Sequence, residues 1–123
     1  MRTLTAPLAL AAALLAAAPV HAKPADTGAA KKILIDSVAI PTVAGRGKVP
    51  ELAAYYAGVL KAAGYADSDI VITPMGETAT FAATLQGTTK EKPILLLGHM
   101  DVVEADAKDW TRDPFVPVEE NGY

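Results

Sequence analysis

The chain has 123 residues, which is enough for one modest domain and too few for two. Its fourteen acidic and eleven basic side chains give a formal net charge of −3, which argues against a nucleic-acid surface, because such a surface carries clustered Lys and Arg. It contains no cysteine, so disulfides, thiol catalysis and Cys-ligated zinc are excluded, and any metal must be held by His and carboxylate.

Residues 1–22 have the layout of a secretory signal peptide. Arg2 gives a positive start, residues 8–18 are almost entirely Ala and Leu, and Val20 and Ala22 place small side chains at a cleavage site. The apolar run is shorter than the roughly 20 residues that a membrane span needs. We therefore expect export to the periplasm or beyond, with residues 23–123 remaining; an uncleaved anchor and a buried Ala-rich helix are the alternatives.

Two helices are predicted in the first half of the mature chain. Asp26 or Thr27 can cap the first helix, which Pro41 ends, and residues 41–47 are typical of an exposed loop. Pro50 suits the first turn of the second helix, and Gly64 stands where its C-terminal cap is expected. The apolar stripe of the second helix is predicted to be buried and comprises Leu52, Tyr55, Tyr56, Val59, Leu60 and Ala63.

Three strands are predicted after Gly64. The first is a β-branched run over residues 70–73 that Pro74 ends, and the second covers residues 80–85. The third, residues 93–98, is continuously apolar, as a strand buried on both faces should be. Two helices followed by three strands predict an α/β sandwich.

The polar residues that follow the third predicted strand are the strongest candidates for chemistry. In an extended chain His99 and Asp101 share one face, because residues two apart point to the same side. A carboxylate beside a metal-bound imidazole can accept its second ring N–H and fix its tautomer. A hydrogen-bonded loop histidine with no metal is the alternative, since a lone H-x-D sequence is common by chance.

The run Leu95-Leu96-Leu97-Gly98-His99-Met100-Asp101-Val102-Val103 resembles the first metal motif of the M20 family of metallopeptidases. Asp109-Trp110 with Asp113-Pro114-Phe115 resembles the W-x-x-DPF stretch of that family, and Asn121-Gly122-Tyr123 resembles the turn before its next strand. Upstream, Ile40-Pro41-Thr42-Val43 resembles the proline loop that follows the family's first helix. The resemblance therefore covers most of the mature chain.

The resemblance implies a metal-dependent hydrolase of peptide or N-acyl amino acid amide bonds. His99 would be a ligand to one of two zinc ions, with cobalt or manganese possible, and Asp101 would be the catalytic residue that orients this histidine. The implied fold is the N-terminal part of a zinc-exopeptidase-like three-layer α/β/α sandwich without a lid domain. Trp110, Pro114 and Phe115 are expected to pack their loop over the sheet.

Two expectations concern what the chain does by itself. The family's bridging aspartate, Glu-Glu pair, final histidine and lid would all follow Tyr123, and Glu119 and Glu120 precede that point and are expected to be solvated. We therefore expect residues 23–123 to be a truncated catalytic domain that is inactive alone. The alternative is a small exported α/β binding or interaction module in which the His99–Asp101 loop is purely structural.

Overall fold

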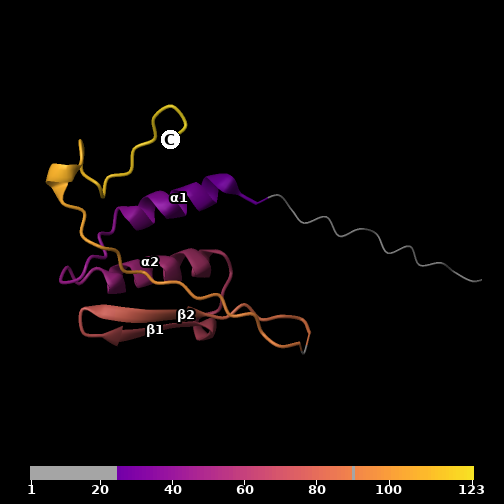
Figure 1. Cartoon of the computed structure of the whole chain (residues 1–123). Helices are drawn as coiled ribbons and strands as arrows, with labels where there is room; N and C mark the ends of the chain where they lie inside the picture. Colours follow the sequence, from indigo (N-terminus) through magenta and orange to yellow (C-terminus); the bar gives the residue numbers. More distant parts are fainter. Residues whose placement is uncertain (1–24, 90) are drawn as a thin grey trace, which may run out of the picture.

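The computed structural model describes residues 25–89 and 91–123 (Figure 1). The predicted signal peptide, residues 1–22, lies outside these described residues. Among the helices that the described ranges contain, none is both long enough and apolar enough to cross a membrane.

Two helices lead the fold, as the sequence predicts. Helix α1 covers Thr27–Val38, and the Asp26 side chain caps it by accepting a hydrogen bond from the Ala29 amide at 3.0 Å. Helix α2 covers Val49–Ala62 and has a proline in its first turn. Gly64 follows α2 with φ of +97°, a left-handed conformation that glycine adopts without the steric penalty of a Cβ atom. The predicted start of α1 is therefore explained by the Asp26 cap, and the predicted end of α2 by the left-handed backbone of Gly64.

A β-hairpin follows α2. Strand β1, Ile70–Met75, pairs antiparallel with strand β2, Thr78–Ala83, and Ile70 lies opposite Ala83. The first two predicted strands are thus confirmed, with shifted ends. Pro74 does not end β1, because a strand on the edge of a sheet tolerates a residue without an amide hydrogen. The described residues contain only these two paired strands, so the sheet has two strands.

The small core lies between α2 and the hairpin. Four residues of α2 are buried, and Ala79 of β2 is buried opposite them. Tyr56 of α2 and Phe81 of β2 extend this contact, with their ring centroids 6.2 Å apart. Of the predicted stripe only Leu52 is buried, while Tyr55, Tyr56, Val59 and Leu60 are half-buried and Ala63 is exposed. The buried α2 residues are Val49, Leu52, Ala53 and Ala57.

Helix α1 has no buried residue of its own and is linked to α2 by a polar cluster around Asp36. Figure 1 shows α2 between α1 and the hairpin. The Tyr55 hydroxyl donates to the Asp36 carboxylate at 2.8 Å, and Lys32 pairs with the same carboxylate at 2.7 Å. The lysine first, and then the tyrosine, hold the pKa of Asp36 below its ordinary value. Partial burial and the hydrogen bond to Asp36 raise the pKa of Tyr55.

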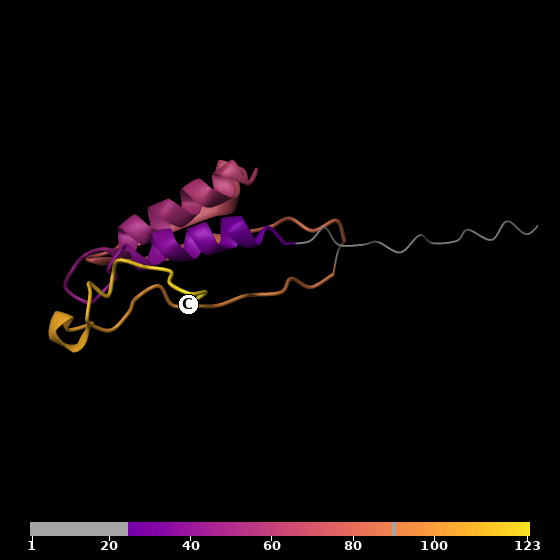
Figure 2. The ribbon, with the colours of Figure 1, turned by 90° about the horizontal axis from the view of Figure 1, so that it is seen from above.

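The prediction of a buried strand over residues 93–98 is wrong for the described structure. This segment is extended but unpaired, and Ile94 to Leu97 are 84–92% exposed. Figure 2 shows it as a separate trace that runs alongside α1, set apart from the helices. A fully buried strand needs neighbouring strands and a layer on each face, and the described residues supply neither. The observed architecture is therefore two helices and a two-stranded antiparallel sheet.

Candidate metal centre

The segment that carries His99 is held by the loop after α1. The Thr42 hydroxyl donates to the Met100 carbonyl at 2.6 Å, and the Val102 amide donates to the Thr42 carbonyl at 3.3 Å. Val43 and Val102 form an isolated parallel β-bridge. Thr42 is only 2% exposed, so these bonds are shielded from water on its side. The loop after α1 therefore fixes the backbone on both sides of Asp101.

His99 and Asp101 lie on the same side of this segment, as the two-residue spacing predicts. The His99 Nδ1 atom lies 2.8 Å from the backbone carbonyl oxygen of Asp101 and 3.5 Å from its carboxylate Oδ1. A carbonyl oxygen can only accept, so Nδ1 carries the hydrogen of this bond. In the neutral ring the lone pair is then left on Nε2. The orienting acceptor is the backbone of Asp101, and its carboxylate stands beside the ring.

Both side chains are open to solvent. The His99 side chain is 82% exposed and that of Asp101 is 71% exposed. They line a cavity of about 550 Å³ between the segment and the hairpin, together with Tyr56 of α2 and Phe81 of β2. The cavity combines an aromatic wall with one imidazole and one carboxylate. A molecule in this cavity that placed a polar group at His99 would therefore have its remaining part against the apolar side chains on the hairpin side.

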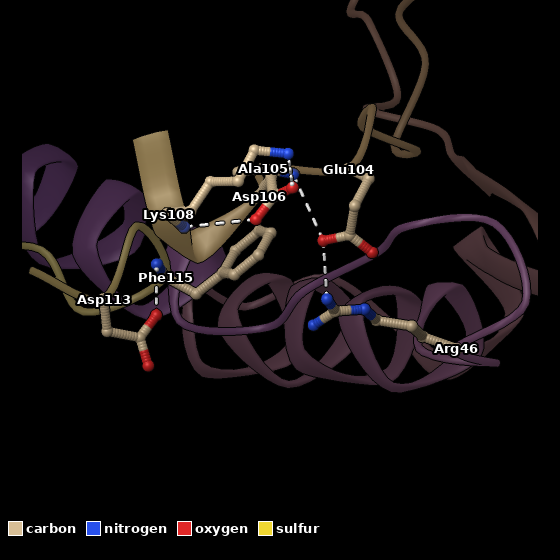
Figure 3. Close-up of polar contacts among 7 residues, drawn as sticks. All are labelled: Arg46, Glu104, Ala105, Asp106, Lys108, Asp113 and Phe115. Carbon is tan, nitrogen blue, oxygen red and sulfur yellow. Dashed lines mark hydrogen bonds and ion pairs between the residues drawn. The ribbon is translucent and has the colours of Figure 1, made fainter. Parts of the chain in front are cut away.

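A second group of contacts orders the chain beyond Asp101. Arg46, from the loop after α1, pairs with Glu104 at 2.6 Å, and its guanidinium lies 5.2 Å from the centre of the Phe115 ring (Figure 3). The Glu104 carboxylate also accepts from the Ala105 amide at 3.1 Å. The Asp113 carboxylate accepts from the Phe115 amide at 2.9 Å. One arginine therefore ties the acidic stretch and the aromatic ring to the loop after α1.

The W-x-x-DPF-like stretch packs differently from the prediction. Trp110 and Phe115 line a second cavity, of about 620 Å³, together with Pro41 and Arg46. We predicted that this stretch covers the sheet, whereas these cavity walls come from the stretch itself and the loop after α1. The Arg46 guanidinium lies 5.2 Å from the centre of the Phe115 ring, so a cation–π contact accompanies this placement.

The acidic residues of the C-terminal stretch do not assemble a metal site among the described residues. No group of three or more His, Asp or Glu side chains there is placed to hold a metal ion. Glu119 and Glu120 are exposed, as predicted, and each has a cationic partner: Glu119 pairs with Lys31, and Glu120 accepts two bonds from Arg112 at 3.0 and 3.1 Å. These two carboxylates are occupied as surface ion pairs.

Sequence reasoning did not identify the residues that position the His99 segment. Thr42 belongs to a loop that resembles the M20 proline loop, and no local pattern indicates that its hydroxyl reaches residue 100. Arg46 stands between two glycines in a stretch that the sequence marks only as a loop. Both roles depend on contacts 58 residues apart in the chain, and no short sequence pattern encodes a partner at that distance.

No protein-family model matches the chain, and neither a curated protein nor a solved structure matches it.

Proposed function

We propose that the chain carries the first metal-ligand segment of a metal-dependent hydrolase that cleaves peptide or N-acyl amino acid amide bonds. The observation that carries this proposal is the bond from His99 Nδ1 to the Asp101 carbonyl at 2.8 Å. It reserves the Nε2 lone pair of the neutral ring for a metal ion, and a ring N–H bound to a backbone carbonyl is a common arrangement for metal-ligating histidines. The adjacent Asp101 carboxylate adds negative charge that favours a bound cation.

The described residues fit part of a metal site only. A catalytic zinc ion takes three protein ligands and an open position, and the described residues offer one imidazole with one carboxylate beside it. The other ligands of a two-metal site would have to come from groups other than these. We therefore assign His99 the role of a ligand and Asp101 the role of positioning it, and we assign no bond-breaking step to the described residues.

The proposal extends to the fold. We propose that α1, α2 and the hairpin are the N-terminal part of a three-layer α/β/α sandwich of the zinc-exopeptidase type. The packing of α2 on one face of the hairpin supports it, because that is one helix-on-sheet layer of such a sandwich. The apolar run Ile94–Leu97 also supports it, because such a run suits an internal strand once neighbours are present.

Zinc binding by the full chain tests the metal proposal, with the two histidines compared by the same substitution. We expect His99→Gln to weaken Zn²⁺ or Co²⁺ binding, measured by isothermal titration calorimetry, by at least about tenfold, because loss of a ligand exceeds the effect of losing an outer-shell partner. His21→Gln is the matched control and should leave the affinity unchanged. Equal weakening of metal binding in both variants, or no weakening in His99→Gln, would contradict the assignment of His99 as a metal ligand.

An amide-hydrolysis assay on the same protein tests the second half of the proposal. With zinc added, we expect no turnover of N-acyl amino acids or dipeptides above a buffer control. Turnover that disappears in His99→Gln would show that the described residues suffice for the reaction and would overturn the incomplete site. If neither zinc binding nor turnover is found, the His99–Asp101 loop is structural and the chain is better described as a small binding module.

A further inference from the structure

Thr42 holds both peptide units that flank the Cα atom of Asp101. Its hydroxyl donates to the Met100 carbonyl at 2.6 Å, and this carbonyl belongs to the peptide unit before Asp101. Its carbonyl accepts from the Val102 amide at 3.3 Å, and this amide belongs to the peptide unit after Asp101. Each of the two planar units is therefore fixed at one of its polar groups. One residue of the loop after α1 thus limits both backbone rotations of Asp101.

The peptide unit after Asp101 connects Thr42 to the imidazole of His99. In a trans peptide unit the C=O and N–H groups point in opposite directions. The N–H of Val102 points to the Thr42 carbonyl. The C=O of Asp101 therefore points the other way, where it accepts from the His99 Nδ1 atom at 2.8 Å. The two hydrogen bonds form a chain through one peptide unit and polarise each other. The direction of the acceptor that His99 uses is thus set from the Thr42 side.

The two ends of this chain of hydrogen bonds differ in exposure. Thr42 is 2% exposed, whereas the His99 side chain is 82% exposed. Water reaches both nitrogens of such a ring, so the ring by itself does not keep its hydrogen on Nδ1. The Asp101 carboxylate is the weaker acceptor here, since its Oδ1 atom lies 3.5 Å from Nδ1. A hydrogen on Nδ1 is therefore favoured by the backbone carbonyl of Asp101, and the buried end of the chain holds that carbonyl in place.

We propose that Thr42 is the positioning residue that selects the tautomer of His99 and thereby presents the Nε2 lone pair to a metal ion. Its hydroxyl and its carbonyl together keep the Asp101 carbonyl within reach of Nδ1. This role rests on the proposed metal-dependent hydrolase, because the lone pair matters only if a metal ion binds there. The effect on the ring is present without metal, so it is measured separately.

Nitrogen NMR of the metal-free full chain measures the tautomer directly. At about pH 9 free imidazoles are neutral, and the chemical shifts of the two ring nitrogens report which one carries the hydrogen. His21→Gln serves as the background, because it removes the signal of the only other histidine in the sequence. We expect the Nδ1–H form of His99 to predominate. Predominance of the Nε2–H form would overturn the proposal even if no variant of Thr42 folds.

Three substitutions in this background test the role of the Thr42 hydroxyl. Thr42→Val deletes the donor and should lower the ratio of Nδ1–H to Nε2–H forms about two- to fivefold, where the upper figure is the factor that one net hydrogen bond contributes. Thr42→Ser keeps the donor and should restore most of the ratio. Gly64→Ala is the control for general loosening, because it strains a residue at φ +97° that takes no part in these hydrogen bonds, and it should leave the ratio unchanged. An unchanged ratio in Thr42→Val, or an equal fall in Gly64→Ala, overturns the proposal.

Zinc titration of the same variants connects the tautomer to the metal ion. Only rings with a free Nε2 lone pair bind, so the apparent affinity falls with the share of such rings. We expect Thr42→Val to weaken Zn²⁺ binding by up to the factor seen in the tautomer ratio, and Thr42→Ser to bind nearly as the natural chain does. If zinc binds and Thr42→Val changes neither quantity, the hydrolase proposal stands and the positioning role is overturned. If Thr42→Val shifts the tautomer but the natural chain binds no zinc, Thr42 still orients the ring and the metal role is overturned.

Discussion

The hydrogen bond from the Thr42 hydroxyl to the Met100 carbonyl holds the loop after α1 against the His99 segment. Its removal should lower the free energy of unfolding by a measurable amount. Thr42→Val keeps the branched shape and deletes the donor of the 2.6 Å bond to the Met100 carbonyl. A net intramolecular hydrogen bond contributes about 1 kcal/mol, and an acceptor left fully buried costs up to about 3 kcal/mol. Because Met100 is only half-buried, water can reach its carbonyl, and the lower figure applies. We expect a loss of about 1 kcal/mol in the free energy of unfolding.

Urea unfolding followed by circular dichroism measures this loss. With an m-value of about 1–2 kcal/mol/M, 1 kcal/mol corresponds to a downward shift of about 0.5–1 M in the midpoint. Thr42→Ser keeps the hydroxyl and should recover most of the loss, and Thr80→Val makes the same exchange at an exposed strand residue. Hydrogen exchange at the Val102 amide should also speed up in Thr42→Val alone. If Thr42→Val and Thr80→Val behave alike, the hydroxyl does not hold the segment.

Two further predictions concern the helices. Asp36→Asn should reduce the loss of stability in acid: the pKa of Asp36 is lowered on folding from 3.8, so its contribution is present above that pH and disappears as the pH falls through the folded-state value. Unfolding midpoints at neutral and acid pH measure this, and Asp109→Asn, whose carboxylate has no side-chain partner among the described residues, should retain the full pH dependence. Gly58→Ala, in the interior of α2 with open space around it, should raise the unfolding free energy by about 0.5–1 kcal/mol, whereas Gly64→Ala at φ +97° should lower it by about 1–2 kcal/mol. Thermal unfolding of the two variants checks the opposite signs, and a change of the same sign in both would contradict the assignment of Gly64 as a left-handed cap.

Much of the local structure could be predicted because its causes are local. Asp26 caps a helix with an amide three residues away, and Gly64 ends a helix through its own backbone conformation. The two β-rich runs predicted the first two strands, whose pairing through a short turn at Gly76 the structure adds. In each case the interacting groups are neighbours in sequence, so residue type and spacing carry the information. The shared side of His99 and Asp101 has the same origin, since it depends only on alternation in an extended chain.

The sequence by itself determined the two helices, the first two strands and the pairing of an imidazole with the residue two positions later. Only the tertiary structure decided that Thr42 and Arg46 reach segments 58 residues further along, and that Ile94–Leu97 stays exposed. The physical reason is that the burial of a strand depends on the strands and layers beside it. An apolar run indicates only that its burial would be favourable. Without a neighbour to bond its backbone, the run remains extended and uncovered.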